Sequence, residues 1–169
     1  MKIYLAGHVP KGDHETKNFV DWRKQYEKLL PDELEAKCIY PYDRSPEFDE
    51  ADFKKVFGYD CSLIKNSDLM IVNAQTRLGV GTSQEMVIAK YFKKPVITVL
   101  PTDSYSRRPN VTIRGQLIAD WIHPMIDAFS DLIFDDPEQL SALTKERLSR
   151  ITPKDISVID KSIDYANKK

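Results

Sequence analysis

Hydrophobic and polar positions follow each other along the chain in blocks that predict strands and helices in turn. Short apolar runs bounded by turn residues are typical of buried parallel strands, and longer segments with apolar residues at helical spacing indicate helices. The predicted strands are residues 2–6, 37–40, 68–74, 95–100 and 130–134. The predicted helices are residues 15–30, 51–66, 86–92 and 112–128, with one or two more in 137–150 and 153–169. This order predicts an α/β fold in which helices cover both faces of a single five-stranded parallel sheet.

The 169 residues are enough for one domain with a hydrophobic core. We expect residues 1–150 to form the α/β domain and residues 151–169 to form a C-terminal helix packed on it. Residues 101–109 are polar and predict a mobile loop. We expect the helix predicted after that loop to tolerate Pro124 or to kink there.

Composition is that of an ordinary soluble globular protein, with 41% hydrophobic and 30% charged residues. The formal net charge of -1 gives no electrostatic reason to expect binding to a nucleic acid polymer or to an anionic membrane. The longest apolar runs are too short to span a membrane, and the N-terminal segment becomes polar too soon for a signal peptide. We therefore expect a cytoplasmic protein. Cys38 and Cys61 lack metal-ligand spacing, so we expect apolar filler residues and no metal site.

Two glycines, two hydroxyls and a carboxylate gather in Gly79-Val80-Gly81-Thr82-Ser83-Gln84-Glu85, between the third predicted strand and the following helix. Ligands of open α/β sheets bind at the carboxyl ends of the strands, where helix amides can hold an anion or a sugar hydroxyl. The glycines leave room for such a ligand. One interpretation makes Glu85 a catalytic carboxylate. The other makes Thr82 the N-cap and Glu85 its partner in a capping box.

A second carboxylate could share this site. Asp60 lies within a predicted helix, where Asp has a poor propensity, and it faces the site if that helix packs near the ends of the first and third strands. Two carboxylates suit glycosidic chemistry, one as nucleophile and the other as acid/base or substrate anchor. Asp68, at a helix-to-strand junction, is instead expected to form a turn or a cap.

The first predicted strand leads into further polar residues. Tyr4 either offers its phenol to the site or packs in the core. His8 is either an ordinary loop residue or a ligand contact. The tip at residues 11–13 could contact a phosphate.

Together these residues resemble the nucleoside 2-deoxyribosyltransferase family over about residues 2–100. The resemblance rests on Tyr4-Leu5-Ala6-Gly7, Asp60 with Leu63 and Ser67-Asp68, Gly81-Thr82-Ser83-Gln84-Glu85, Ala89 and Lys94-Pro95-Val96. It implies a flavodoxin-like (Rossmann-like) three-layer sandwich, and cleavage of a nucleoside's N-glycosidic bond with transfer of the sugar to a second base or to water. By position it implies Glu85 as the nucleophile, Asp60 as the group that binds or protonates the base, and Tyr4 as the residue that orients the glutamate. It implies no cofactor and a homo-oligomer of at least two subunits.

The resemblance also bears on the substrate. Many transferases have an Asp where this chain has Gly79, which puts classical transfer between free nucleosides in doubt. A related branch hydrolyses 2'-deoxynucleoside 5'-monophosphates and resembles this chain in Leu78-Gly79-Val80-Gly81 and Thr112-Ile113-Arg114-Gly115. In that branch the hydroxyl at the position of Thr112 reaches a phosphate in a neighbouring subunit's site. The candidate substrate-binding residues are Gly7, His8, Gly79, Gly81, Thr82, Ser83, Thr112 and Arg114.

The short motif before Glu85 also resembles that of the nucleotide phosphoribohydrolases that release cytokinin bases. A non-catalytic nucleotide-binding or sensor module on the same fold is the alternative to an enzyme. A flavin-binding or phosphoacceptor protein of flavodoxin-like shape is the third possibility, although residues 8–12 make a poor phosphate loop. The sequence leaves open which base and which sugar the substrate contains and whether it carries a 5'-phosphate. It also leaves open whether the reaction is transfer or hydrolysis.

Overall fold

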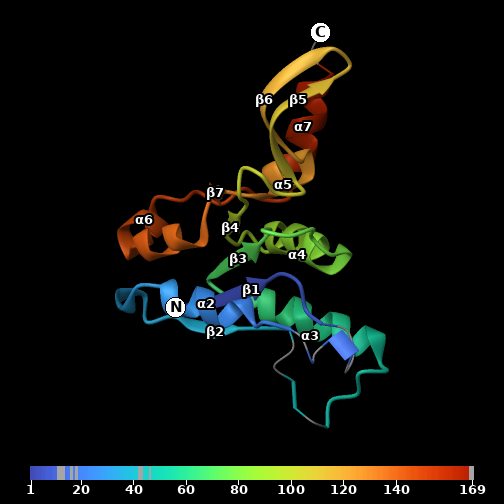
Figure 1. Cartoon of the computed structure of the whole chain (residues 1–169). Coiled ribbons are helices and arrows are strands. Elements are labelled where there is room, and N and C mark those ends of the chain that lie inside the picture. The colour runs from blue at the N-terminus through green and yellow to red at the C-terminus, as the bar shows by residue number, and fades with distance from the viewer. Residues whose placement is uncertain (11–13, 16, 18, 42–43, 46, 168–169) are drawn as a thin grey trace.

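A five-stranded parallel sheet forms the centre of the computed structural model, which describes residues 1–10, 14–15, 17, 19–41, 44–45 and 47–167 (Figure 1). The strand order is β2-β1-β3-β4-β7. The strands are β1 (Lys2–Ala6), β2 (Lys37–Ile39), β3 (Leu69–Asn73), β4 (Val96–Val99) and β7 (Leu132–Phe134). The predicted α/β class and all five predicted strands are confirmed. The predicted phosphate contact at residues 11–13 lies outside the described residues.

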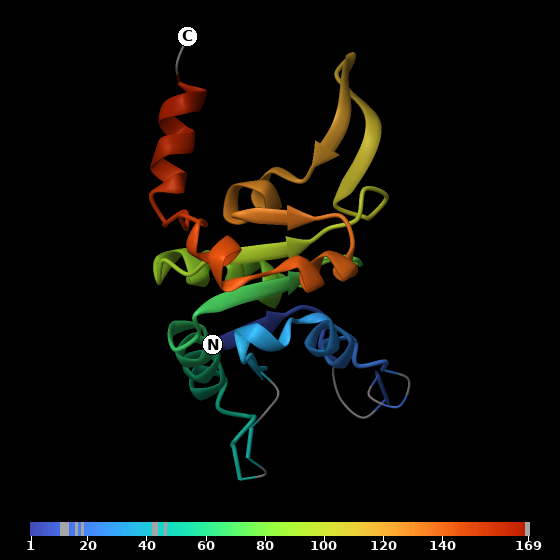
Figure 2. The same ribbon diagram turned by 90° about the vertical axis from the view of Figure 1, so that its left-hand side faces the viewer.

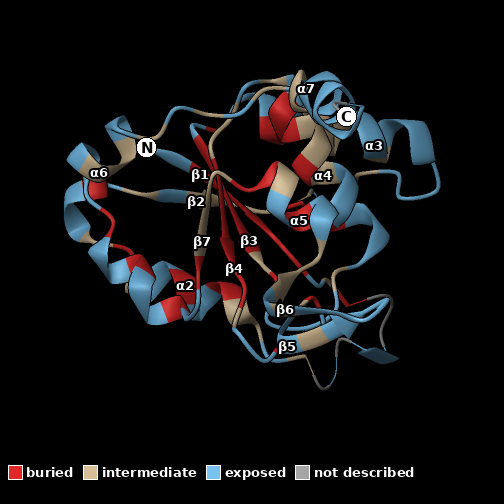
Figure 3. Cartoon of the chain, turned by 90° about the horizontal axis from the view of Figure 1, so that it is seen from above, coloured by how far each residue is buried: buried red, intermediate tan, exposed pale blue. Residues whose placement is uncertain are grey.

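Side chains of successive strand residues point to opposite faces of the sheet, and each face has its own hydrophobic core. Ile3 and Leu5 of β1 belong to the core under α2 (Trp22–Leu29) and the 3-10 turns η1 (Asp32–Leu34) and η2 (Pro137–Ala142). Tyr4 and Ala6 belong to the core on the other face. That face is covered by α3 (Phe53–Lys65), α4 (Val80–Tyr91) and α5 (Pro124–Phe129). Figure 3 shows the buried residues concentrated along the strands, as expected of a sheet covered on both sides.

The helix predicted over residues 15–30 is not continuous, because residues 19–21 are not helical and α2 begins at Trp22. The side chain of Asp21 accepts a hydrogen bond from the backbone N–H of Arg23 and so caps the helix at this point. Asp68 lies at a bend just before β3, and its carboxylate accepts the backbone N–H of Lys2 at 2.8 Å, so this side chain joins the amino ends of β1 and β3.

A β-hairpin replaces the last residues of the predicted polar loop, 107–109, and most of the helix predicted over residues 112–128. β5 (Arg107–Ile113) pairs antiparallel with β6 (Gln116–Ile122), and Figure 2 shows the hairpin projecting away from the parallel sheet. The two residues between the strands, Arg114 and Gly115, have φ values of 51° and 82°. A two-residue turn with both central φ values positive matches the twist of a hairpin, and Gly adopts such a φ without strain. The helical prediction is therefore wrong here.

The only helical part of that segment is α5. Pro124 stands in the first turn of this helix, where proline loses no hydrogen bond, so of the two alternatives for Pro124 the helix tolerates it. The base of the hairpin is held by Arg107. Its guanidinium forms ion pairs with Asp120 and Asp135 and donates to the carbonyl of Leu100.

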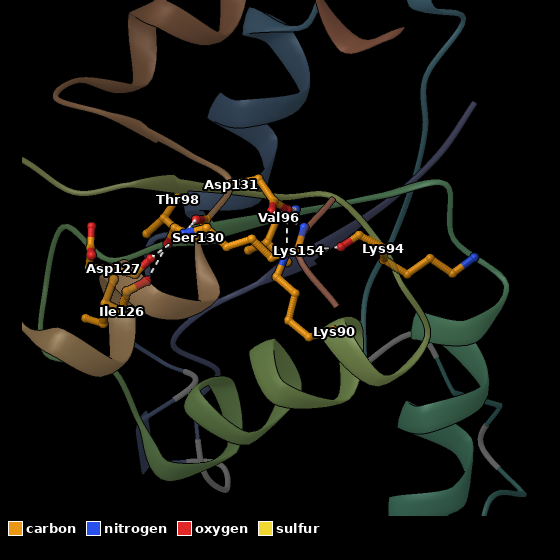
Figure 4. A network of polar contacts seen from close by, with 9 residues as sticks. All are labelled: Lys90, Lys94, Val96, Thr98, Ile126, Asp127, Ser130, Asp131 and Lys154. Atoms are coloured by element: carbon orange, nitrogen blue, oxygen red, sulfur yellow. Dashed lines mark hydrogen bonds and ion pairs between the residues drawn. The ribbon is translucent and has the colours of Figure 1, made fainter. Parts of the chain in front are cut away.

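A buried ion pair joins α4 to the amino ends of β4 and β7 (Figure 4). The side chains of Lys90 and Asp131 are 0% and 2% exposed. Asp131 also accepts the backbone N–H groups of Val96 and Lys154, each at 2.7 Å. Burial lowers the pKa of Lys90, and the pair with Asp131 opposes that change. The network lies at the opposite end of the sheet from the carboxyl ends of the strands.

The C-terminal segment runs through α6 (Lys145–Ser149) and ends in α7 (Val158–Ala166). Lys154, just before α7, donates from its ammonium to the carbonyls of Asp127 and Ser130. α7 itself contains no buried residue, and in Figure 2 it projects from the same side of the sheet as the hairpin. The division into residues 1–150 and 151–169 stays a prediction. Among the described residues no helix is long and apolar enough to cross a membrane.

Candidate active site

A cavity of about 440 Å³ opens at the carboxyl ends of β1 and β3. These strands are neighbours, and the chain leaves them toward opposite edges of the sheet, toward β2 from β1 and toward β4 from β3. Such a switch point is where open α/β sheets hold their ligands. The described residues that line the cavity are Gly7, His8, Val9, Pro10, Glu15, Pro41, Arg44, Asp60, Gly79, Val80, Gly81, Thr82 and Glu85.

A second cavity of similar volume also contacts the first turns of α4. Its described lining residues are Arg77, Leu78, Val80, Ser83, Gln84, Met86, Val87, Tyr105, Ser106, His123, Met125, Ile126 and Phe129. None of them carries a carboxylate. The cavity that contains Glu85 and Asp60 is therefore the one that offers the paired carboxylates of glycosidic chemistry.

Glu85 reaches the cavity from the second turn of α4, because the helix begins at Val80 with Gly79 as its N-cap. The predicted capping box does not form. Thr82 lies inside the helix, and the N-cap residue is Gly79, which has no side chain to accept a capping hydrogen bond. The carboxylate of Glu85 instead accepts a hydrogen bond from the Tyr4 hydroxyl, from Oη to Oε1, at 2.8 Å. A structural role at the helix end therefore does not account for Glu85.

Tyr4 is fully buried in β1 and is aimed at Glu85. Burial, reinforced by the charge of Glu85, raises the pKa of Tyr4 far above its ordinary value. The phenol therefore keeps its proton and acts as a permanent donor to Glu85. Of the two alternatives for Tyr4, the one that brings its phenol to the site agrees with this contact.

The pKa of Glu85 is raised to about 7. Burial of the carboxyl is the main cause, the negative charge of Asp60 adds to it, and the hydrogen bond from Tyr4 opposes it. A carboxylate with this pKa is partly ionised at neutral pH and more basic than an exposed one, which suits a nucleophile or a general base.

Replacing Tyr4 with phenylalanine is expected to raise the pKa of Glu85 further. The phenol stabilises the ionised carboxylate, so its removal shifts the titration upward, by about one pH unit for a hydrogen bond to a charged group. A carbon-13 NMR titration of the Glu85 carboxyl measures the midpoint. Tyr91→Phe, at an exposed tyrosine on the same helix, serves as the control and should leave the midpoint in place. A midpoint that stays or falls in Tyr4→Phe contradicts the expected role.

Asp60 lies in α3 and shares the cavity with Glu85. Its Oδ1 accepts a hydrogen bond from Nη2 of Arg44 at 2.8 Å, within an ion pair. Burial raises the pKa of Asp60, Arg44 opposes this rise, and the charge of Glu50 reinforces it. The structure thus brings together Tyr4, Glu85 and Asp60 from β1, α4 and α3.

Arg44 is a cavity residue that the sequence analysis missed. Residues 42–52 contain five acidic residues and Arg44 as their only basic one, and this isolated charge was the available signal. Its side chain is 8% exposed despite the polar sequence around it.

The candidate substrate-binding residues fall into two groups. Gly7, His8, Gly79, Gly81 and Thr82 line the cavity with Glu85. Ser83 lines the second cavity instead, and its hydroxyl donates to the carbonyl of Gly79. Thr112 and Arg114 are exposed on the hairpin and are not among the lining residues of either cavity. Their role in a neighbouring subunit's site stays a prediction.

Gly7 is the glycine of this site whose lack of a side chain matters for packing. A Cβ atom there would lie 2.6 Å from Cζ2 of Trp22 and 3.1 Å from Cβ of Asn73. Gly7→Ala is therefore expected to destabilise the protein by about 1–3 kcal/mol, the usual cost of overpacking. Urea unfolding measures this loss. Gly81→Ala is the matched control, because nothing lies within 4 Å of its Cβ position and alanine favours a helix. Equal stability of the two variants would contradict this packing argument.

The described residues contain no group of three or more His, Cys, Asp or Glu side chains arranged to hold a metal ion. Cys38 and Cys61 are free and partly buried. Cys38 packs against the core, as a filler residue does, and burial raises its pKa to about 12.

No protein-family model matches the sequence, and no curated protein matches it significantly. Solved structures do resemble the fold. A 2-deoxyribosyltransferase from Bacillus psychrosaccharolyticus has a TM-score of 0.60 and 23% identity, covering 90% of this chain and 98% of its own. A conserved protein from Enterococcus faecalis V583 has a TM-score of 0.59 and 18% identity, covering 86% and 98%. A 2-deoxyribosyltransferase from Leishmania mexicana has a TM-score of 0.56 and 18% identity, covering 83% and 94%. The chain thus has the flavodoxin-like fold of these proteins, as expected.

Proposed function

We propose that this protein cleaves the N-glycosidic bond of nucleosides, deoxynucleosides or their 5'-monophosphates, with Glu85 as the nucleophile. The observation that carries the proposal is the Glu85 carboxylate, held by Tyr4 and facing Asp60, in a cavity at the strand ends. The likeness of the fold to two 2-deoxyribosyltransferases supports it. In this role Glu85 attacks the sugar, Tyr4 orients Glu85, and Asp60 binds or protonates the base.

The reaction proceeds in two displacements at the anomeric carbon. The free oxygen of ionised Glu85 attacks that carbon while the bond to the base nitrogen breaks, and the bonding electrons leave with the base. The transition state has oxocarbenium character, and the base takes up a proton as it departs. Water or a second base then attacks the anomeric carbon of the glycosyl ester, gives up a proton and releases Glu85. Tyr4 holds one carboxylate oxygen, which leaves the other for the attack.

The proposal includes the substrate-binding residues and the assembly. Gly7, His8, Gly79, Gly81 and Thr82 would surround the sugar, since they line the cavity around the nucleophile. Thr112 and Arg114 would reach a 5'-phosphate in the site of a neighbouring subunit of a cytoplasmic homo-oligomer. The exposed position of both residues on a projecting hairpin supports this part.

A base-release assay tests the function. The protein is incubated with 2'-deoxyribonucleosides, ribonucleosides and their 5'-monophosphates, and free base is measured by chromatography. A second base added to the mixture separates transfer from hydrolysis. We expect free base from at least one of these substrates. Release from none of them would overturn the proposal, and calorimetric binding without turnover would then support a nucleotide-binding module.

A further inference from the structure

Arg44 has two carboxylate partners on different elements. Nη2 donates to Oδ1 of Asp60 at 2.8 Å, and Nη1 donates to Oε2 of Glu50 at 2.7 Å. The two partners differ in exposure: the Asp60 side chain is 23% exposed and that of Glu50 is 62% exposed. Of these two ion pairs, the one with Asp60 belongs to the cavity wall and is the better shielded from water.

Two aromatic rings hold the guanidinium in place. The Arg44 carbon Cζ lies 5.1 Å from the ring centre of Phe48 and 5.5 Å from that of Tyr59. The two rings contact each other edge to face, with centres 5.3 Å apart. Such a cradle fixes the direction of a planar cation, so the hydrogen bond to Asp60 is preorganised.

Asp60 therefore has one oxygen engaged and one oxygen available. Within the described part of the chain, Oδ1 is bound by Arg44 and no hydrogen bond occupies Oδ2. Burial raises the pKa of Asp60, and the charge-assisted hydrogen bond from Arg44 opposes this rise by stabilising the ionised carboxylate, which only accepts hydrogen bonds. This favours one of the two roles that the sequence leaves open for Asp60, binding the base or protonating it.

We propose that Arg44 keeps Asp60 as an ionised acceptor for an N–H group on the edge of the leaving base. The proposal rests on the proposed function and names its substrate class: nucleosides or nucleotides whose base offers an N–H donor to the cavity. Arg44 is then a positioning residue that acts through Asp60. The departing base takes its proton from water.

Matched substrates test the inference on the unaltered protein. Each cleaved substrate is paired with an analogue that lacks the N–H group: 2'-deoxyadenosine with purine 2'-deoxyriboside, 2'-deoxycytidine with pyrimidin-2-one 2'-deoxyriboside, thymidine with 3-methylthymidine. Substrate and analogue carry the same sugar, with or without a 5'-phosphate, and the combination that is cleaved fastest is used. We expect kcat/KM to be about ten- to a hundredfold lower for the analogue, as for the loss of a hydrogen bond to a charged group. In Asp60→Ala this ratio should approach one. A ratio that is the same with and without the Asp60 carboxylate overturns the inference.

The pH profile of Arg44→Met separates an acceptor from a proton donor. Removing the cation raises the pKa of Asp60, so an ionised acceptor is lost at a higher pH than before. The acid limb of kcat/KM for the N–H substrate therefore moves upward relative to that of its analogue, for which only Glu85 must be ionised. A protonated donor would instead stay active to higher pH. Within the described ranges, the titratable and charged groups that interact with Asp60 or share its cavity are Arg44, Glu50, Glu85, Tyr4, Cys61, His8 and Glu15.

Two further variants serve as controls. Arg44→Lys keeps the charge and is expected to restore the acid limb, at least in part. Glu50→Gln removes the exposed partner of Arg44 and leaves its pair with Asp60, so the substrate ratio should be unchanged. If Arg44→Met instead stays active to higher pH, with no upward movement of the acid limb, the inference is overturned. If no substrate releases a base at all, it is the proposed function that fails.

Discussion

Replacing Glu85 with alanine is expected to stop base release, lowering kcat by at least about 10³-fold, because the nucleophile is lost and water alone must attack the sugar. Asp60 is a poor substitute for this carboxylate, since it is tied to Arg44 by an ion pair and lies on a different helix. Chromatographic measurement of free base over time, at enzyme concentrations high enough to detect single turnover, gives the ratio of rates.

A neighbouring residue provides the control for that variant. Gln84→Ala changes an exposed side chain on the same helix that lines the other cavity, so its rate should stay close to that of the unaltered protein. Mass spectrometry after brief mixing with a cleaved substrate should find the sugar attached to the peptide that contains Glu85. An alanine variant as active as the parent would show that Glu85 is not the nucleophile.

The largest expected effect on stability comes from Asp131→Ala. This change leaves the ammonium of Lys90 buried without its counter-ion, and such a loss costs about 3–5 kcal/mol. The backbone N–H groups of Val96 and Lys154 lose their acceptor at the same time. Urea unfolding followed by circular dichroism measures the change in the free energy of unfolding.

A surface ion pair supplies the comparison. Glu146 and Arg150 also form an ion pair, one turn apart on the chain, with side chains that are 74% and 76% exposed. Glu146→Ala should cost less than about 1 kcal/mol, because water screens the pair. Adding Lys90→Met to Asp131→Ala should recover part of the lost stability by removing the buried charge. Equal losses for Asp131→Ala and Glu146→Ala would argue against this interpretation of the network.

The local pattern of apolar and polar residues predicted the parallel sheet correctly, but it did not predict the hairpin. The inner strands β1, β3 and β4 are short apolar runs that are almost entirely buried, which is typical of a parallel sheet covered on both faces. Residues 107–122 mix charged, β-branched and apolar positions, and the hairpin that they form is largely exposed. The turn at Arg114 and Gly115 was the local signal, but without a buried face the period of the pattern does not separate a strand from a helix.

The sequence by itself determined the α/β fold, the order of its five parallel strands along the chain, and the placement of a glycine-rich turn and Glu85 after the third strand. It could do so because apolar periodicity and turn residues act over a few neighbouring positions. Only the tertiary structure decided that Glu85 lies in the second turn of α4, bound by Tyr4 from β1, and that Arg44 from a polar loop pairs with Asp60. These contacts join residues that are far apart along the chain or on different elements. Their geometry depends on how the sheet and helices pack together, and no local pattern contains that information.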